Sequence, residues 1–218
     1  SDRIRNAGGI AVELPLIKIQ PTDTCWINKL PILNNIQHAI FISPNAVTCF
    51  FNALPSNKHT QFKQITSYAL GQGTQKALKQ HAILNPRLPA HPDSEHLLML
   101  DNLQAIQGQN ILLIKGKGGR KRIQETLVHR GAYITAIDVY QRILPQYKPS
   151  DIQSLWHEDA VDIILITSKT ALQHLLSLFE GEATSWLYRK PCLVISERLA
   201  KAAYQCGFKT VITDSTGI

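Results

Sequence analysis

Hydroxyl, amide, glycine and cationic side chains gather in five short turns of this chain, each between an apolar run and a helical pattern. In open parallel sheets, ligands bind beyond the carboxyl ends of the strands, where helix N-termini offer unpaired N–H groups to anions. The set therefore predicts recognition of carboxylate or phosphate groups. For any single Ser, Thr or Asn, helix N-capping is the commoner role, so the prediction rests on the whole set. The five turns are Ser43-Pro44-Asn45, Gly71-Gln72-Gly73-Thr74, Lys115–Arg120, Thr167–Thr170 and Ser196–Arg198.

Several motifs that would indicate a particular chemistry are missing from the sequence. The run Lys115–Arg120 lacks the spacing of a Walker phosphate loop, and no glycine-rich dinucleotide motif follows a strand. The sequence has no G-x-S-x-G turn for an acyl-transfer serine. His91–His96 lacks the H-E-x-x-H spacing and favours a solvated loop over a metal site. We therefore expect neither a metal nor another cofactor.

The charge balance favours an anionic partner. The chain has 23 Lys and Arg against 16 Asp and Glu, which gives a net charge of +7. Such a charge suits nucleic acid, a membrane surface or a multiply acidic small molecule, and composition alone does not choose among them. The dense basic cluster at Lys115–Arg122 has no interleaved aromatic residues of the kind that stack on single strands. Apolar runs such as Ile111–Ile114 fall far short of the roughly 20 residues of a membrane span.

Cysteine usage indicates a reducing compartment. Cys25, Cys49, Cys192 and Cys206 show no C-x-x-C spacing, and in a chain of 218 residues they fit reduced packing residues better than a disulfide framework. With no leader-like segment in the sequence, this predicts a cytoplasmic protein. The only methionine is Met99, so we expect a processed protein or a fragment.

The elements that would position the turns show an internal repeat. Apolar runs of four to eight residues alternate with helical patterns, which is typical of an α/β fold with parallel sheets. A strand at 38–42 ends at Ser43, and 125 residues later a second strand ends at Ser168. The same separation relates Gly71 to Ser196, each of which follows a strand and precedes a helix. Any α/β chain yields some such similarity, but two units at one separation predict two similar lobes.

The start of the chain matches the end of another unit. A helix over Arg120–Arg130 and a strand over Tyr133–Tyr140 follow a third predicted strand and turn. Asp2–Gly8 resembles the end of that helix, and Ile10–Ile17 resembles the strand after it. The first strand of this N-terminal copy is missing, so about 15 to 20 residues are expected to precede it. The other copy continues into a helix over Asp93–Ile106, so the C-terminus is also expected to be cut.

This arrangement predicts a discontinuous lobe, 1–17 plus 146–218, with a second lobe, 24–138, inserted into it. The two pieces of the first lobe are each too short to hold a core, but together they contain the same units as the second. Residues 18–23 and 139–145 cross between the lobes. We expect these two extended segments to pair as a two-stranded antiparallel hinge.

Five short motifs follow one another along the chain: Phe41–Val47, Gly71–Thr74, Gly116–Arg120, Val139-Tyr140 followed by a basic residue, and Ser196–Ala200. In this order they resemble the motifs of uroporphyrinogen-III synthases, and the resemblance covers essentially the whole chain. The first is similar to the family's F-[TS]-S-x-N-A-V turn, and the last has the form common to its gamma-proteobacterial members. The resemblance implies two HemD-like lobes of flavodoxin-like α/β type, with parallel sheets flanked by helices.

The resemblance also implies an activity, that of a cyclising lyase. The family closes hydroxymethylbilane, a linear tetrapyrrole with eight carboxylates, to uroporphyrinogen III while inverting ring D. The terminal hydroxyl leaves to give an azafulvene, the substituted carbon of ring D is attacked, and a spiro intermediate recombines in the inter-lobe cleft. No cofactor takes part. We therefore expect a monomer that binds this small molecule, and neither nucleic acid nor a membrane.

Carried over onto this chain, the resemblance assigns substrate binding to the turns and general acid catalysis to Tyr140. The Tyr140 hydroxyl would assist departure of the leaving hydroxyl, although simple core packing is an equally open role at the end of a strand. Leu199 stands where the family often has a second threonine, related to Thr74 by the repeat. The expected substrate-binding residues are Ser43, Asn45, Gly73, Thr74, Lys115, Gly116, Ser168 and Ser196.

Two other functions stay open at this stage. A two-lobed binding protein without catalysis would close on a small anionic ligand and show no turnover. A basic nucleic-acid-binding module would show an affinity that falls steeply with salt. Formation of the type III isomer from hydroxymethylbilane separates both from a synthase.

Overall fold

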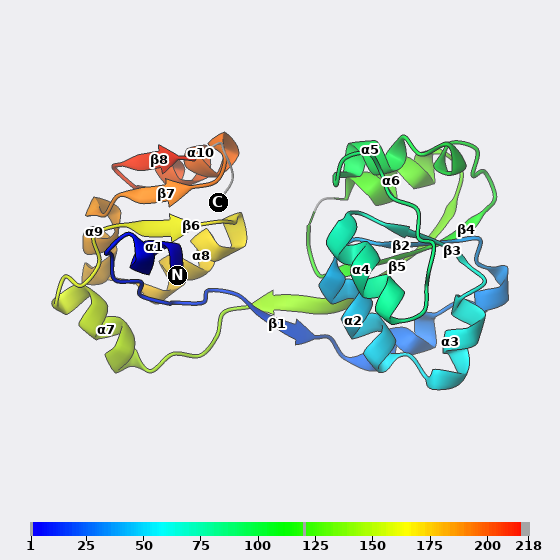
Figure 1. Cartoon of the computed structure of the whole chain (residues 1–218), viewed down its shortest axis with the longest axis horizontal. Coiled ribbons are helices and arrows are strands. Elements are labelled where there is room, and N and C mark those ends of the chain that lie inside the picture. Colours follow the sequence, from blue (N-terminus) through cyan, green and yellow to red (C-terminus); the bar gives the residue numbers. More distant parts are fainter. Residues whose placement is uncertain (1, 120, 215–218) are drawn as a thin grey trace. The chain divides into compact units, whose positions relative to one another are not determined.

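The computed structural model describes residues 2–119 and 121–214. Arg120, which the sequence placed in a turn and at the start of a helix, lies outside the described residues, as do Ser1 and Ser215–Ile218 at the two predicted cuts. The chain divides into two compact units: unit 1, Ser1–Lys18 with Ile143–Ile218, and unit 2, Ile19–Arg142 (Figure 1).

Unit 2 contains a five-stranded sheet. Its strands are β1 (Lys18–Pro21), β2 (His38–Phe41), β3 (Thr66–Ala69), β4 (Asn110–Gly116) and β5 (Tyr133–Ile143), in the order β1-β5-β4-β2-β3. Strands β2 to β5 pair in parallel, and the alignment of β2 with β4 runs from His38 opposite Ile111 to Phe41 opposite Ile114. Continuous apolar runs such as these suit a parallel sheet that is covered on both faces.

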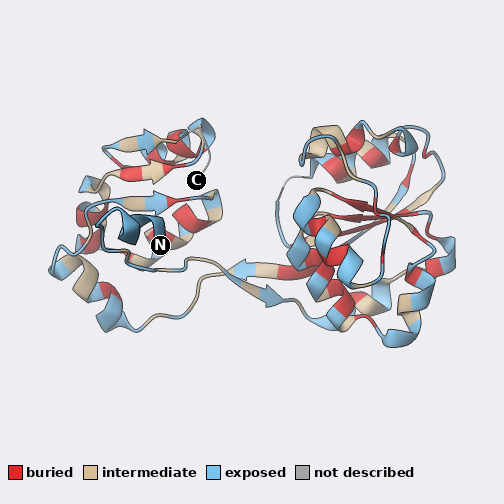
Figure 2. Ribbon diagram, viewed as in Figure 1, coloured by how far each residue is buried: buried red, intermediate tan, exposed pale blue. Residues whose placement is uncertain are grey.

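Successive residues of the inner strands point to opposite faces of this sheet, so each strand contributes to two apolar cores. Phe41 and Leu112 belong to a core on one face, and Ile40 and Leu113 belong to a separate core on the other. Figure 2 shows these strands as buried. The helices are α2 (Pro44–Ala53) and α4 (Gln72–Gln80) on the first face, and α5 (Ser94–Leu98) and α6 (Arg122–His129) on the second. The prediction of an α/β fold with helices flanking a parallel sheet is confirmed here.

Short helices complete unit 2, and Trp26 joins one of them to the core of the first face. The ring of Trp26 stacks on Phe50 of α2 at 5.2 Å between centroids. The remaining elements are α3 (Ser56–Phe62) and the 3-10 helices η1 (Thr24–Lys29), η2 (Leu33–Asn35) and η3 (Asp101–Leu103). Together they fill the loops between the strands and α helices.

The helix predicted over Asp93–Ile106 is wrong as one continuous element. The structure has α5 over Ser94–Leu98 and then the separate 3-10 helix η3. Asp93 caps the start of α5, since its carboxylate accepts the His96 N–H at 2.8 Å. Leu100 has extended backbone angles, φ −61° and ψ 130°, which end the helical turn before η3 begins.

Strand β1 lies next to β5 at the edge of the unit 2 sheet, and Figure 1 shows their arrows pointing in opposite directions. The Thr22 N–H donates to the Val139 carbonyl at 3.1 Å, and the Thr22 hydroxyl donates to the Asp138 carbonyl at 2.7 Å. The first contact joins the segments 18–23 and 139–145, and the second reaches the residue just before the latter. Movement of the two segments as a hinge stays a prediction.

Unit 1 contains a three-stranded parallel sheet in the order β6-β7-β8. Its strands are β6 (Ile164–Ile166), β7 (Cys192–Val194) and β8 (Val211–Thr213), and its helices are α1 (Asp2–Asn6), α7 (Pro149–His157), α8 (Lys169–Leu178), α9 (Glu182–Arg189) and α10 (Glu197–Cys206). In the part of the chain that the structure describes, no helix combines the length and the apolar character that a membrane span requires.

The sheet of unit 1 buries one face only. Ile166 and Val194 point into a core that α7 to α10 supply with apolar residues. On the opposite face, Leu165, Leu193 and Ile212 stand side by side across the three strands. Leu165 is 43% exposed and Ile212 is 46% exposed. Among the described residues, therefore, nothing covers this face fully.

The strand predicted over Ile10–Ile17 is not formed, and the described chain has no regular element between Asn6 and Lys18. Leu14, Leu16 and Ile17 still pack against the core of unit 1. A strand is defined by its backbone hydrogen bonds to a neighbour, and among the described residues this segment forms no ladder with β6, β7 or β8. The apolar pattern of this segment thus predicted its burial correctly, but the strand hydrogen bonds that were expected with it are not formed.

Candidate active site

Ser43 stands at the carboxyl end of β2 and begins helix α2. Its backbone is extended, with φ −158° and ψ 161°, and its Oγ accepts the Ala46 N–H at 3.2 Å, as a helix N-cap does. Pro44 follows at the first helical position, where its missing N–H costs nothing. The side chain is half-buried. Capping uses the oxygen of Ser43 as an acceptor and leaves its hydroxyl hydrogen available to a second partner.

The phenol of Tyr140, near the end of β5, meets this serine. Tyr140 is 1% exposed, and its hydroxyl lies 3.1 Å from Ser43 Oγ. Arg142 Nη2 donates to the same phenolic oxygen at 2.9 Å, and the Arg142 guanidinium carbon lies 5.2 Å from the centre of the Tyr140 ring. A cation over the face of an aromatic ring is attracted to that ring electrostatically. Arg142 therefore stabilises Tyr140 through two interactions, one with its ring and one with its hydroxyl.

Gly116, the last residue of β4, packs against the ring of Tyr140. The register between β4 and β5 shifts after Lys115, so that Gly116 stands opposite Tyr140. The contact leaves no room for a side chain at Gly116. The structure thus brings together three of the predicted site residues, Ser43, Gly116 and Tyr140.

Lys115 lies apart from this group. Its Nζ lies 2.6 Å from Oδ1 of Asp138, with the two side chains 21% and 41% exposed. The pair lines a cavity of about 220 Å³ together with Leu113, which belongs to the core on the face of the sheet that α5 and α6 cover. Tyr140, against which Gly116 packs, belongs to the core on the other face, with residues of α2. The other residues that line the cavity are Gly118, Gly119, Lys121 and Gln124.

The turn after β3 lies beside the turn after β2. A Cβ atom on Gly73 would lie 3.3 Å from Cγ of Pro44, which is a tight contact between the starts of α4 and α2. Thr74 is 3% exposed, whereas Asn45 and Gly73 are exposed. The structure therefore places Gly73 near the Ser43 turn, and Thr74 faces inward more than the sequence suggested.

Ser168 and Ser196 cap two helices of unit 1 in the manner of Ser43. Ser168 Oγ accepts the Ala171 N–H at 3.1 Å at the start of α8, and Ser196 Oγ accepts the Leu199 N–H at 3.3 Å at the start of α10. They follow the neighbouring strands β6 and β7. Both side chains are half-buried, so each has a hydroxyl hydrogen that a ligand could meet.

Comparison with known proteins identifies the family. The family model for uroporphyrinogen-III synthase HemD matches residues 1–216. The chain belongs to the uroporphyrinogen-III synthase family. The resemblance that the five motifs indicated is thereby confirmed.

Curated uroporphyrinogen-III synthases from enteric bacteria are similar to the chain over most of its length. The synthases of Escherichia coli (strain K12) and Salmonella typhimurium (strain LT2) are each 32% identical over 216 residues, which covers 96% of this chain and 87% of the relative. The synthase of Proteus mirabilis is 31% identical over 180 residues, with 81% of this chain and 90% of the relative covered.

Solved structures of uroporphyrinogen-III synthases share the fold. A mutant synthase from the extremely thermophilic bacterium Thermus thermophilus has a TM-score of 0.64 at 16% identity, with 97% of this chain and 86% of that chain covered. The synthase of Helicobacter pylori 26695 has a TM-score of 0.65 at 17% identity, with 92% and 84% covered. At these identities the likeness supports the α/β fold with parallel sheets flanked by helices.

Two polar residues of this candidate site were not named from the sequence. The motif predicted only a basic residue after Val139-Tyr140, and it assigned no role to Asp138. Both lie two positions from Tyr140, and strand alternation places residues i−2, i and i+2 on one face of a regular strand. The bulge after Lys115 breaks this rule, since Asp138 pairs with Lys115 while Arg142 contacts Tyr140.

Metal-binding and thiol groups do not add to this site. Within residues 2–119 and 121–214, no three His, Cys, Asp or Glu side chains are grouped so that they could hold a metal ion. Burial raises the pKa of the Cys192 thiol to about 11, so this thiol stays protonated near neutral pH.

Proposed function

We propose that this chain converts hydroxymethylbilane to uroporphyrinogen III, with inversion of ring D. A uroporphyrinogen-III synthase takes part in porphyrin and heme biosynthesis. The observation that carries the proposal is the cluster of Ser43, which follows β2, with Tyr140 and Arg142 near the carboxyl end of β5, in a chain that belongs to this family. A cyclising lyase without a cofactor needs such a place to hold and protonate its substrate.

Recognition of the substrate is proposed to use the helix starts at which serines act as caps. The substrate has eight carboxylates, and the chain has a net charge of +7. Helices α2, α8 and α10 have ten residues each, and each begins at a serine whose hydroxyl hydrogen is not used by the cap. Hydrogen bonds from hydroxyl and N–H donors to carboxylates are charge-assisted and stronger than neutral ones. Asn45, Gly73, Thr74, Lys115 and Gly116 are proposed to complete the binding set.

The chemical step requires more orientation than covalent work from the protein. Loss of the terminal hydroxyl gives an azafulvene, attack on the substituted carbon of ring D gives a spiro intermediate, and this intermediate recombines. Holding the reacting carbons in place lowers the barrier by several kcal/mol relative to a freely moving chain. Acid catalysis of hydroxyl departure is proposed to depend on Tyr140, whose hydroxyl lies beside Ser43.

The decisive experiment incubates the protein with hydroxymethylbilane and separates the type I and type III isomers after oxidation. We expect type III to predominate, whereas buffer alone and heat-denatured protein give type I by spontaneous closure. A product that is type I at every protein concentration would overturn the proposal. The alternative of a non-catalytic protein that binds a small anion predicts that result together with saturable binding, and the relatives, all named as synthases, do not favour it.

The setting in which the enzyme works is proposed from the same sequence features. We propose a cytoplasmic monomer that takes a small-molecule substrate and binds neither nucleic acid nor a membrane. Size-exclusion chromatography with light scattering tests the monomer, and a filter-binding assay at low salt tests the lack of nucleic-acid affinity.

A further inference from the structure

Tyr140 is too deeply buried to meet a substrate directly. Only 1% of the residue is exposed, and its hydroxyl contacts Ser43 and Arg142. Ser43 is half-buried and begins α2 beyond the carboxyl end of β2, at the edge where parallel sheets bind ligands. Of the two hydroxyl groups, the one placed to contact a substrate is therefore that of Ser43.

The hydrogen bonds of this cluster form a chain in which Arg142 donates to Tyr140 and Tyr140 donates to Ser43. A guanidinium group has N–H donors and no acceptor, so the phenolic oxygen of Tyr140 must accept from Arg142. The hydrogen of the Tyr140 hydroxyl then has Ser43 Oγ as its acceptor at 3.1 Å, and leaving that buried hydrogen unpaired would cost free energy. Ser43 Oγ thus accepts from Tyr140 and from the Ala46 N–H, which uses both its lone pairs. The one hydrogen left to donate outward is that of the Ser43 hydroxyl.

We propose that Ser43, Tyr140 and Arg142 form a proton relay in which Ser43 protonates the leaving hydroxyl and Tyr140 re-protonates Ser43. The inference rests on the proposed function, because the leaving hydroxyl is that of hydroxymethylbilane. It makes Ser43 the catalytic residue that touches the substrate. Tyr140 replaces the proton that Ser43 gives up. Arg142 is a positioning residue that fixes the phenolic oxygen of Tyr140 and stabilises the negative charge that forms on it.

The relay conserves protons and electrons over the whole reaction. As the terminal C–O bond breaks, its electron pair stays with the oxygen, which takes the Ser43 proton and leaves as water. The pyrrole nitrogen supplies the electron pair of the new exocyclic double bond, so the azafulvene forms with its nitrogen protonated. The Tyr140 proton moves to Ser43, and the phenolate is left beside the Arg142 guanidinium. The proton released when the last pyrrole ring regains aromaticity returns to Tyr140 through Ser43.

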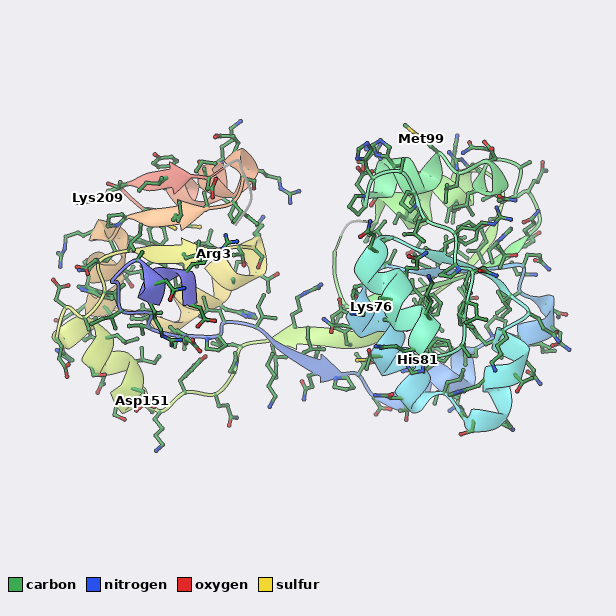
Figure 3. The ribbon with its side chains drawn as sticks, in the orientation of Figure 1. Arg3, Lys76, His81, Met99, Asp151 and Lys209 are labelled. Atoms are coloured by element: carbon green, nitrogen blue, oxygen red, sulfur yellow. The ribbon has the colours of Figure 1, made fainter. Side chains whose placement is uncertain are left out.

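The first test compares kcat and KM of Arg142→Gln and Arg142→Lys with those of the unaltered protein. Arg142→Gln is expected to lower kcat by about 10- to 100-fold with a change in KM below about 3-fold, because general acid catalysis typically contributes about 10²-fold or more. Arg142→Lys keeps the charge and a donor, so it is expected to recover at least part of the loss. Arg3→Gln on α1 of unit 1 is the matched control for one lost positive charge, and it is expected to change neither constant (Figure 3).

The second test counts the protons that move in the chemical step. Single-turnover rates in mixtures of H₂O and D₂O are expected to curve with deuterium content in the unaltered protein, since two protons move together. In Tyr140→Phe the rate is expected to be lower and the dependence linear, because Ser43 then donates alone. Ser43→Ala is expected to lose about 100-fold or more in rate, and Ser43→Thr, which keeps the hydroxyl, to lose far less. Circular dichroism of each variant confirms that it is folded.

Failure of the relay and failure of the proposed function give different results. If the unaltered protein forms no type III isomer, the function is wrong and the relay has no reaction to serve. If type III forms but Arg142→Gln keeps full kcat, or the isotope dependence is linear before Tyr140 is altered, the relay is overturned and the function stands. A folded Ser43→Ala protein with full activity would also overturn the relay.

Discussion

A Cβ atom on Gly116 would lie 2.5 Å from Cζ of Tyr140, closer than real Cβ contacts come. Gly116→Ala must therefore displace the Tyr140 ring from Ser43 and Arg142. We expect a loss of stability of about 1–3 kcal/mol, as for other overpacked cores, and a fall in kcat of at least about 10-fold. Chemical denaturation measures the first, and the type III isomer assay measures the second.

The control for this variant is a double-mutant cycle. In a Tyr140→Ala background the ring is absent, so adding Gly116→Ala is expected to cost less than about 0.5 kcal/mol of stability. An equal cost in both backgrounds would show that Gly116 is needed for a reason other than the ring of Tyr140.

Capping and substrate binding at Ser168 can be separated by one substitution. Ser168→Asp keeps an N-cap acceptor for the Ala171 N–H, so stability is expected to change by less than about 0.5 kcal/mol, whereas Ser168→Ala is expected to cost about 1 kcal/mol. If Ser168 binds a substrate carboxylate, the new carboxylate repels it, and KM is expected to rise at least about 5-fold in Ser168→Asp. An unchanged KM in Ser168→Asp would show that Ser168 caps α8 and does not bind the substrate. Ser177→Asp, within α8, is the control for the added charge.

The ion pair between Lys115 and Asp138 is expected to affect substrate affinity. Asp138 neutralises Lys115 at 2.6 Å, so the lysine is not fully available to a substrate carboxylate. Asp138→Asn is expected to lower KM by about 2- to 5-fold because it removes a repelling charge and releases Lys115, and Lys115→Gln is expected to raise KM by a similar factor. Steady-state kinetics at low and high salt measure both. A rise of KM in Asp138→Asn would mean that the carboxylate serves to position Lys115 for the substrate.

His38 makes stability depend on pH. Its Nε2 lies 2.6 Å from Gln109 Oε1 and its Nδ1 lies 3.1 Å from the Tyr68 hydroxyl, and burial, with the nearby Arg87 charge, lowers its pKa below 6.5. Because the unfolded chain then takes up the proton first, stability is unaffected above about pH 6.5 and falls as the pH drops from 6.5 through the lowered pKa.

The measurement for His38 is the free energy of unfolding in urea between pH 7.5 and pH 5. His38→Gln is expected to flatten this pH dependence, because the variant has no imidazole at the buried position. Burial also lowers the pKa of His81, so some slope is expected to remain in His38→Gln. A slope equal to that of the unaltered protein would show that His38 does not titrate in this range.

The sequence predicted those elements whose local and tertiary signals agree. The strand at His38, the Ser43 cap and the helix after it were predicted together, because an apolar run, an N-cap residue and a 3.6-residue period coincide there. The strand at Ile10–Ile17 failed because an apolar pattern predicts burial, and this segment packs against the core of unit 1 without joining its sheet. The helix at Asp93 failed because backbone angles at one residue, Leu100, ended it.

The candidate site was predictable in part: some of its residues were named from the sequence, but Arg142, Asp138 and the grouping of the residues were not. Ser43, Gly116 and Tyr140 were named from the sequence and lie in contact. Lys115, next to Gly116 in the chain, lines a cavity apart from these residues because neighbouring residues of a strand face opposite sides of the sheet. The bulge that aligns Gly116 with Tyr140 has no pattern in the sequence that would have revealed it.

The exposed face of the unit 1 sheet affects how the unfolding experiments should be read. Leu165, Leu193 and Ile212 form an apolar row on the folded protein, and such a row offers a binding place to dyes that fluoresce on apolar surfaces. A dye-based melting curve of this chain would start from a raised signal, which makes its transition harder to compare between variants. Far-ultraviolet circular dichroism or calorimetry, which report the backbone or the heat of unfolding, are therefore the methods suited to comparing its variants.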